Sequence, residues 1–159
     1  MQKIIVSFSG GRTSAFMSHL LLQNFDRKDL CFVFANTGKE RFETLDFIHQ
    51  CDFHFKMDLT WLEAKVFHEE RKGTSYKIVD HKTASRKGEP FAEVNKKYGT
   101  PNKNYPHCTR ELKEAPIKKW AIETLGRNNY QMAIGIRADE RRRVNRLRAE
   151  KKWLDLPFS

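Results

Sequence analysis

The sequence has little cysteine and no long apolar run. Its three cysteines, Cys31, Cys51 and Cys108, are scattered among 159 residues and form no CxxC pair. This spacing excludes a disulfide scaffold and a self-contained zinc site, and it favours reduced thiols in the cytoplasm. No apolar run approaches the ~18 residues of a membrane span, and the N-terminus lacks a signal-peptide pattern, so no membrane partner is expected.

Acidic residues are outnumbered, and the excess of positive charge is concentrated in two segments. The net charge is +10, and residues 71–104 and 127–152 each contain nine Lys or Arg against three acids. Either these segments are solvated surface, or they face a polyanionic partner such as a nucleotide, a nucleic acid or a sulfated compound. Hydrophobic residues make up 39% of the chain, which is typical of a globular domain.

Short apolar runs alternate with segments of helical periodicity. The runs predict strands at Ile4–Phe8, Leu30–Ala35, Phe53–Met57 and Tyr130–Ile136. Helices are predicted at 13–24, Phe42–Cys51, Thr109–Leu125 (with a kink or break at Pro116) and Asp139–Lys152. Residues 60–104 are rich in turn signals and predict an irregular insertion over one edge, with a helix at Trp61–Glu69. This alternation predicts an α/β domain built on a parallel sheet.

The stretch "VSFSGGRTSAF" passes from the first predicted strand into the first predicted helix. Between them lie Ser9, Gly10, Gly11, Arg12, Thr13 and Ser14. A glycine-rich turn at this junction directs backbone N–H groups and the positive end of the helix towards an anion, and the hydroxyls add donors. The alternative is an ordinary strand–helix turn with Ser and Thr caps. The loop is neither a Walker A motif nor GxGxxG.

Three further segments carry candidate chemistry. Thr37 and Gly38 follow the second strand, and Gly135 and Arg137 follow the last predicted core strand, so both pairs belong at the edge where open α/β sheets bind ligands. Cys108 stands at a helix start beside His107, Arg110 and Lys113, and such surroundings should lower the thiol pKa. Cys108 is therefore a candidate nucleophile, persulfide carrier or metal ligand, or else a structural thiol.

Four of these segments resemble motifs of the phosphoadenosine phosphosulfate (PAPS) reductase-like family. "SFSGGRTS" resembles the pyrophosphate-binding loop of the adenine nucleotide alpha-hydrolase-like superfamily, to which the ATP pyrophosphatases also belong. "FANTGKERFETLDFI" resembles the family's D-T-G-x-x-F-x-E-T block, with Asn36 where an Asp is usual. "HCTRELKEAP" and "GIRADERRR" resemble two later blocks. The resemblance spans residues 3 to about 143.

The resemblance implies a three-layer Rossmann-like fold, with residues 1–159 as one nucleotide-binding domain and an adenine nucleotide, ATP or PAPS, as ligand. Mg²⁺ could accompany the nucleotide, a thiol reductant such as thioredoxin could be a partner, and the basic helix could contact nucleic acid. The implied nucleotide- or phosphate-binding residues are Ser7, Ser9, Gly10, Gly11, Arg12, Thr13, Ser14, Asn36, Thr37, Gly38, Arg110, Lys113, Gly135, Arg137 and Arg142. Cys108 is the candidate catalytic thiol because of its basic neighbours, not because of the resemblance.

The chain departs from the family in its cysteines. Cys108 has no neighbouring or later cysteine, so a self-contained iron–sulfur cluster is not expected. The nucleophilic cysteine that PAPS reductases carry after the core has no counterpart following Arg143. Either the reaction differs, or these residues are the N-terminal part of a longer chain. Three functions stay open: thiol-dependent reduction of a sulfonucleotide, ATP pyrophosphatase chemistry that adenylylates a substrate, and nucleotide or nucleic-acid binding without turnover.

Overall fold

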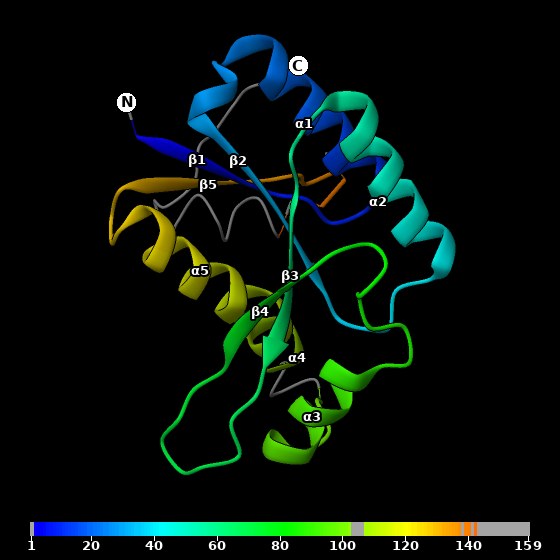
Figure 1. Cartoon of the computed structure of the whole chain (residues 1–159), viewed down its shortest axis with the longest axis vertical. Coiled ribbons are helices and arrows are strands. Elements are labelled where there is room, and N and C mark those ends of the chain that lie inside the picture. The colour runs from blue at the N-terminus through cyan, green and yellow to red at the C-terminus, as the bar shows by residue number, and fades with distance from the viewer. Residues whose placement is uncertain (1, 103–106, 138, 141, 143–159) are drawn as a thin grey trace.

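The fold is built on a five-stranded sheet in the order β4-β3-β2-β1-β5 (Figure 1). The computed structural model describes residues 2–102, 107–137, 139–140 and 142. Its strands are β1 (Lys3–Ser7), β2 (Leu30–Asn36), β3 (Thr60–Lys65), β4 (Ser75–Val79) and β5 (Tyr130–Ile134). Strands β5, β1, β2 and β3 run parallel, and β4 pairs antiparallel with β3. The predicted α/β Rossmann-like fold is confirmed, with the correction that one edge strand makes the sheet mixed.

Helices cover both faces of the sheet and complete the three layers (Figure 1). Helices α1 (Arg12–Asn24) and α2 (Phe42–Phe55) pack on one face, and α5 (Ala115–Leu125) packs on the other. The remaining elements are α3 (Glu89–Tyr98), the short α4 (His107–Thr109), a π-helical turn at Arg110–Glu114 and a 3₁₀ turn at Arg27–Asp29. None of the helices in the described part of the chain has the length and apolar character that a membrane span requires.

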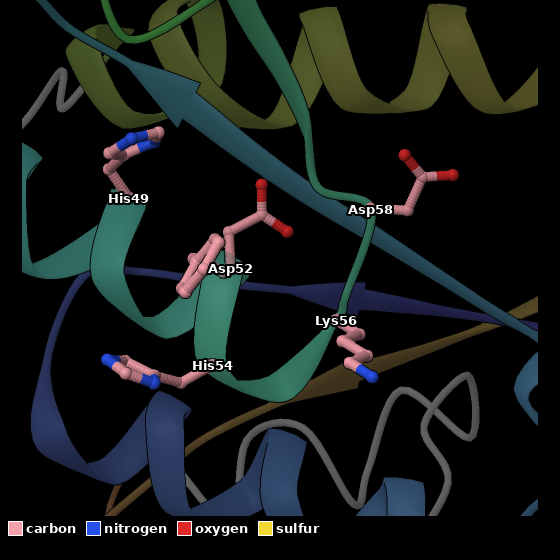
Figure 2. Close-up of a pocket in the computed structure, with 6 residues that line it drawn as sticks. His49, Asp52, His54, Lys56 and Asp58 are labelled. Carbon is pink, nitrogen blue, oxygen red and sulfur yellow. The ribbon is translucent and has the colours of Figure 1, made fainter.

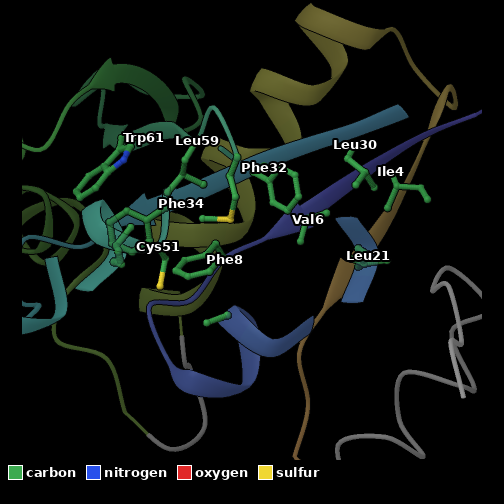
Figure 3. Packing of buried hydrophobic residues seen from close by; sticks show 14 of the residues in the cluster. Ile4, Val6, Phe8, Leu21, Leu30, Phe32, Phe34, Cys51, Leu59 and Trp61 are labelled. Atoms are coloured by element: carbon green, nitrogen blue, oxygen red, sulfur yellow. The ribbon is translucent and has the colours of Figure 1, made fainter. Parts of the chain in front are cut away.

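The central strands β1 and β2 are mostly apolar because both of their faces are buried. In β2, Phe32 and Phe34 pack towards α1 and α2, whereas Val33 and Ala35 pack towards α5. Figure 3 shows Phe32 and Phe34 beside Val6, Phe8 and Trp61 in the first of these layers. Burial of each large apolar side chain contributes about 1.5–3 kcal/mol. This packing fixes the sheet to which the functional loops are attached.

The third strand lies later in the chain than the sequence predicts. Phe53–Met57 was expected as a strand, but Phe53, His54 and Phe55 form the last turn of α2. The third parallel strand is β3, within the Trp61–Glu69 segment that was predicted as a helix. The prediction for Trp61–Glu69 is wrong because a strand buried on both faces shows no alternation of apolar and polar residues, and "TWLEAK" contains good helix formers. The prediction for Phe53–Met57 is wrong because "FHFKM" alternates like a strand although its first three residues end a helix.

The predicted irregular insertion at residues 60–104 contains regular elements. It supplies a core strand (β3), the antiparallel edge strand (β4) and the helix α3. Only the connections between these elements are irregular, so the prediction of an irregular segment is wrong for β3, β4 and α3, although β4 does lie at an edge of the sheet.

The predicted break near Pro116 takes the form of a π-helical turn. Pro116 stands at the start of α5, directly after the π turn Arg110–Glu114. Proline lacks the N–H group that would bond to the carbonyl of Leu112, which explains a departure from α geometry just before it. Of the predicted basic helix Asp139–Lys152, all but Asp139, Glu140 and Arg142 lies outside the described residues.

Candidate functional site

The predicted phosphate loop lies at the point where the chain changes direction across the sheet. After β1 the chain passes through α1 to β2, which lies on one side of β1. The strand β5 follows α5 in the chain and lies on the other side of β1. The carboxyl ends of β1 and β5 are in register, Ser7 opposite Ile134. In open α/β sheets, ligands bind in the crevice outside the carboxyl ends of the strands where the connections diverge. Residues 8–14 and 135–137 follow these two strand ends.

Two adjacent glycines in this loop have different roles. Gly10 has a φ of +79°, and a Cβ atom there would lie 2.9 Å from side-chain atoms of Ile48 and Thr44 in α2. The fold itself therefore requires glycine at position 10. Gly11 has an ordinary φ of −97° and is exposed, and its nearest neighbour would be the Ser9 hydroxyl at 3.7 Å. No requirement of the fold explains the glycine at position 11, but close approach of a ligand would.

The N-terminus of α1 begins in this loop without a side-chain cap. Gly11 is the N-cap residue, and the first intrahelical bond runs from the Ala15 N–H to the Gly11 carbonyl at 3.1 Å. The N–H groups of Arg12 and Thr13 therefore have no acceptor within the helix. Arg12 is exposed and Thr13 is half-buried. This helix end provides backbone donors and a positive dipole for an anion.

Ser14 shapes the loop from inside. Its side chain is buried, and its hydroxyl accepts hydrogen bonds from the Ser9 N–H (3.2 Å) and the Ser9 hydroxyl (3.1 Å). The same hydroxyl donates to the Gly11 carbonyl at 2.8 Å. Ser14 thus fixes the turn, while Ser9 and Thr13 are the hydroxyl residues nearer to solvent.

The loop after β5 packs directly against the start of α1. A Cβ atom on Gly135 would lie 3.3 Å from the Cα and N atoms of Ser14, so a larger residue would require the two segments to move slightly apart. Arg137 follows, exposed, with its guanidinium on the Asp139 carboxylate (Nε to Oδ1 3.0 Å). The structure therefore brings the first and last motifs together. Arg142 is exposed.

The segment after β2 is more buried than the loop after β1. Asn36 is fully buried and Thr37 nearly so. The Asn36 amide donates to Glu63 Oε1 (2.7 Å) and to the Ser85 carbonyl (2.8 Å), and its Oδ1 accepts the Gly38 N–H (3.2 Å). Gly38 has a φ of +78° and packs against Gly88 and Pro90 at the start of α3. Asn36 therefore holds this turn in place through a hydrogen bond made in the protein interior, and its side chain does not face solvent.

Sequence reasoning missed Glu63, which is buried and charged. Its carboxylate accepts hydrogen bonds from Asn36, from the Ser85 N–H and hydroxyl, and from Lys77 at 2.9 Å. Burial opposes the charge, but these hydrogen bonds outweigh it and lower the pKa of Glu63 below its ordinary value. A glutamate within the apolar run "WLEA" is the signal that could have identified it.

The motif "HCTRELKEAP" lies beside the motif that begins at Asn36. Lys113 Nζ is 3.7 Å from Glu40 Oε1, and Glu40 accepts a hydrogen bond from the Thr37 hydroxyl. Arg110 pairs with the neighbouring Glu111, which also accepts from Thr74. Cys108 is half-buried against a small cluster formed by Ala64, Val94 and Leu112. This packing supports the structural interpretation of its thiol.

Several cations of the first basic segment, residues 71–104, are bound within the protein. Lys77 pairs with Glu63 and Lys72 pairs with Glu69. Lys97 donates to the carbonyls of Phe67 and Lys72, and Arg86 donates to those of Ala84 and His81. A polyanionic partner is not needed to explain these four residues.

Two surface hollows lie near the amino ends of the strands, away from the loops described above. One is lined by residues of the C-terminal half of α2 and the turn before β3, namely His49, Asp52, Phe53, His54, Lys56 and Asp58. In Figure 2 its labelled side chains spread apart and do not converge on one point. The other hollow lies beside Gln2, Lys3 and Asn129. Among the described residues, no group of three or more His, Cys, Asp or Glu could bind a metal ion.

Comparisons with known proteins agree with the four motifs. Residues 3–155 match the model of the phosphoadenosine phosphosulfate reductase domain. The chain is 37% identical over 144 residues to the uncharacterized nin region protein ORF290 of Escherichia phage lambda, covering 88% of this chain and 50% of that protein. It is 29% identical over 137 residues to the uncharacterized protein MJ0066 of Methanocaldococcus jannaschii, covering 86% of this chain and 23% of that protein.

The chain thus spans half or less of the length of these relatives. No solved structure gives a significant match. The family model covers nearly all of the chain. The chain belongs to the phosphoadenosine phosphosulfate reductase domain family, and so to a superfamily of adenine nucleotide-binding proteins.

Proposed function

We propose that the crevice outside β1 and β5 binds an adenine nucleotide, with its phosphates at the start of α1. The observation that carries this proposal is the uncapped N-terminus of α1, which lies at the divergence of the sheet connections and is packed against Gly135. The N–H groups of Arg12 and Thr13 donate to phosphate oxygens, and Ser9 and Thr13 add hydroxyls. Arg137 contacts the phosphates from the β5 side, since a guanidinium suits their paired oxygens.

The family favours reduction of a sulfonucleotide as the reaction. A thiolate attacks the sulfonyl sulfur, the bond from sulfur to the phosphate oxygen breaks, and the nucleoside bisphosphate leaves with that electron pair. A dithiol partner of the thioredoxin kind then attacks the modified thiol, becomes oxidised to a disulfide and releases sulfite. Donors at the start of α1 stabilise the leaving phosphate. Within this chain, Cys108 is the candidate thiol.

ATP cleavage is a second candidate, and the packing of Cys108 favours it. This reaction needs no protein thiol: a substrate atom attacks the α-phosphorus and pyrophosphate leaves. Of the three cysteines, Cys51 is in the core, Cys31 is in β2, and Cys108 is half-buried against apolar side chains. Mg²⁺ would bind here through the nucleotide phosphates, as is usual for this ion with phosphorylated substrates. Bound in that way, it would neutralise charge on the leaving pyrophosphate.

Titration with ATP and with PAPS, with pyrophosphate and sulfite measured in parallel, tests the proposal. Sulfite released from PAPS in the presence of a dithiol supports the reductase, and pyrophosphate released from ATP supports the pyrophosphatase. Binding of either nucleotide without product supports a binding module. The absence of binding to both nucleotides would overturn the proposed function.

A further inference from the structure

A polar row crosses three strands at the carboxyl edge of the sheet. Asn36 in β2, Glu63 in β3 and Lys77 in β4 are register partners, and their side chains are joined by hydrogen bonds of 2.7 and 2.9 Å. The row immediately behind, on the same face, is the apolar trio Phe34, Trp61 and Val79. The change from apolar to polar therefore occurs at the last row before the proposed nucleotide site.

Stability alone does not account for a buried carboxylate at this place. Glu63 is fully buried, and a buried ion pair contributes little more than well-packed apolar side chains of similar volume. The neighbouring row shows that this face accepts such side chains. All groups that face the Glu63 oxygens are donors, so its charge is fully compensated.

Glu63 is linked through Asn36 to the Thr37–Gly38 turn at the carboxyl edge of the sheet. Because both amide hydrogens of Asn36 are engaged, by Glu63 and by the Ser85 carbonyl, its Oδ1 is fixed in the position that accepts the Gly38 N–H. This bond closes a turn around Thr37 of the kind that Asn side chains favour. An aspartate at position 36 would place a carboxylate against two acceptors.

We propose that Glu63 and Lys77 are positioning residues of the nucleotide site, acting through Asn36 on the Thr37–Gly38 turn. This inference rests on the proposed function, because it assumes that the turn borders the bound nucleotide. It assigns a role to two residues outside the four motifs, and it explains why an amide stands at position 36. Lys77 is half-exposed on an edge strand, so it can be replaced with little disturbance of the core.

The test measures ATP affinity by calorimetry and hydrogen exchange of the Gly38 amide by NMR in the unliganded protein. Lys77→Met should weaken ATP binding about tenfold and accelerate Gly38 exchange by a similar factor, since a hydrogen bond to a charged group is lost. Lys77→Arg should restore both quantities. Lys119→Met removes the same charge from an exposed position on α5, where no ion pair is found among the described residues, and should change neither.

Asn36→Asp provides a second variant on the other side of Glu63. It should also weaken ATP binding and expose the Gly38 amide, since the acceptor for that N–H is no longer fixed. Unchanged Gly38 exchange in both Lys77→Met and Asn36→Asp would overturn the positioning role, even if ATP affinity fell. If the wild-type protein binds neither ATP nor PAPS, the proposed function fails, and Gly38 exchange alone decides the positioning role.

Discussion

At the scale of single residues, neighbouring glycines separate the needs of the fold from those of a ligand. Gly10 adopts a left-handed conformation and lies against α2, whereas Gly11 is exposed with an ordinary backbone conformation. A side chain at position 10 therefore disturbs packing, and a side chain at position 11 occupies the space in front of the α1 N-terminus. From the sequence, both glycines were predicted to have the same role in an anion-binding turn.

Gly11→Val should abolish nucleotide binding and leave the fold intact. A Cβ atom at this position would meet no atom of the protein closer than the Ser9 hydroxyl, and the branched valine side chain obstructs the approach of a phosphate to the Arg12 and Thr13 N–H groups. Calorimetric titration with ATP and thermal unfolding measure the two effects. Gly10→Ala is the matched control and should lower the unfolding temperature, because its Cβ atom overlaps Ile48 and Thr44. Normal ATP binding by Gly11→Val would show that the phosphate site lies elsewhere.

Glu63 should make stability depend on pH in the acidic range. Since the folded-state pKa of Glu63 is lowered, its stabilising contribution is present above its ordinary pKa of about 4.3 and is lost as pH falls through the lower folded value. Glu63→Gln lacks this contribution. The difference in unfolding free energy between wild type and variant, measured by urea denaturation, should shrink between about pH 6 and about pH 3. A difference that is constant over this range would mean that Glu63 is not preferentially charged in the fold.

At the scale of elements, the success of sequence-based prediction depended on how each segment is buried. The strands β1, β2 and β5 were predicted because short β-branched and aromatic runs lie between clear helices or turns. In contrast, "FHFKM" alternates like a strand, but its aromatic residues end α2, where Phe53 is 77% exposed. β3 was missed because its helix-forming residues adopt the strand conformation only through pairing with β2.

The helical assignment of Phe53 has a direct consequence for stability. Ile48 lies on the buried face of α2 with no exposed surface, while Phe53 points outwards. Phe53→Ser should change the unfolding free energy by less than about 0.5 kcal/mol, as expected for an exposed position. Ile48→Ala should cost about 2–5 kcal/mol through the cavity it leaves. Urea denaturation of both variants measures the contrast, and a comparable loss in Phe53→Ser would contradict the exposed placement.

The same limits apply to the candidate site. The sequence predicted the motifs after β1, β2 and β5, since glycines and arginines near strand ends mark the carboxyl edge. It did not predict that Asn36 faces inwards or that Ser14 fixes the loop, because both depend on contacts between segments distant along the chain or on burial. Glu63, Lys77 and Ser85 come together only when β3, β4 and the following loop are assembled.

At the scale of the whole molecule, the net charge of +10 has to be divided between internal and external roles. Four cations of the first basic segment are engaged within the protein, whereas Lys82 and Lys87 are exposed. Arg137 is also exposed, and it follows Gly135, which packs against the start of α1. A small nucleotide at the crevice would contact Arg137 and leave the exposed lysines unused.

Arg137→Ala should therefore weaken ATP binding by about 1.5–3 kcal/mol, the range for a hydrogen bond to a charged group. A phosphate can displace the Asp139 carboxylate from the guanidinium, since that pair is exposed to solvent and exposed ion pairs are weak. Lys82→Gln and Lys87→Gln should each change ATP affinity by less than about 0.5 kcal/mol.

If a nucleic acid were the ligand instead, all three substitutions would have similar effects. Binding to a polynucleotide through six to ten phosphates would then fall by about 10³–10⁵ between 50 and 200 mM salt. Calorimetry of the three variants with ATP, and with a polynucleotide at both salt concentrations, distinguishes these cases, and equal losses would contradict a dominant Arg137.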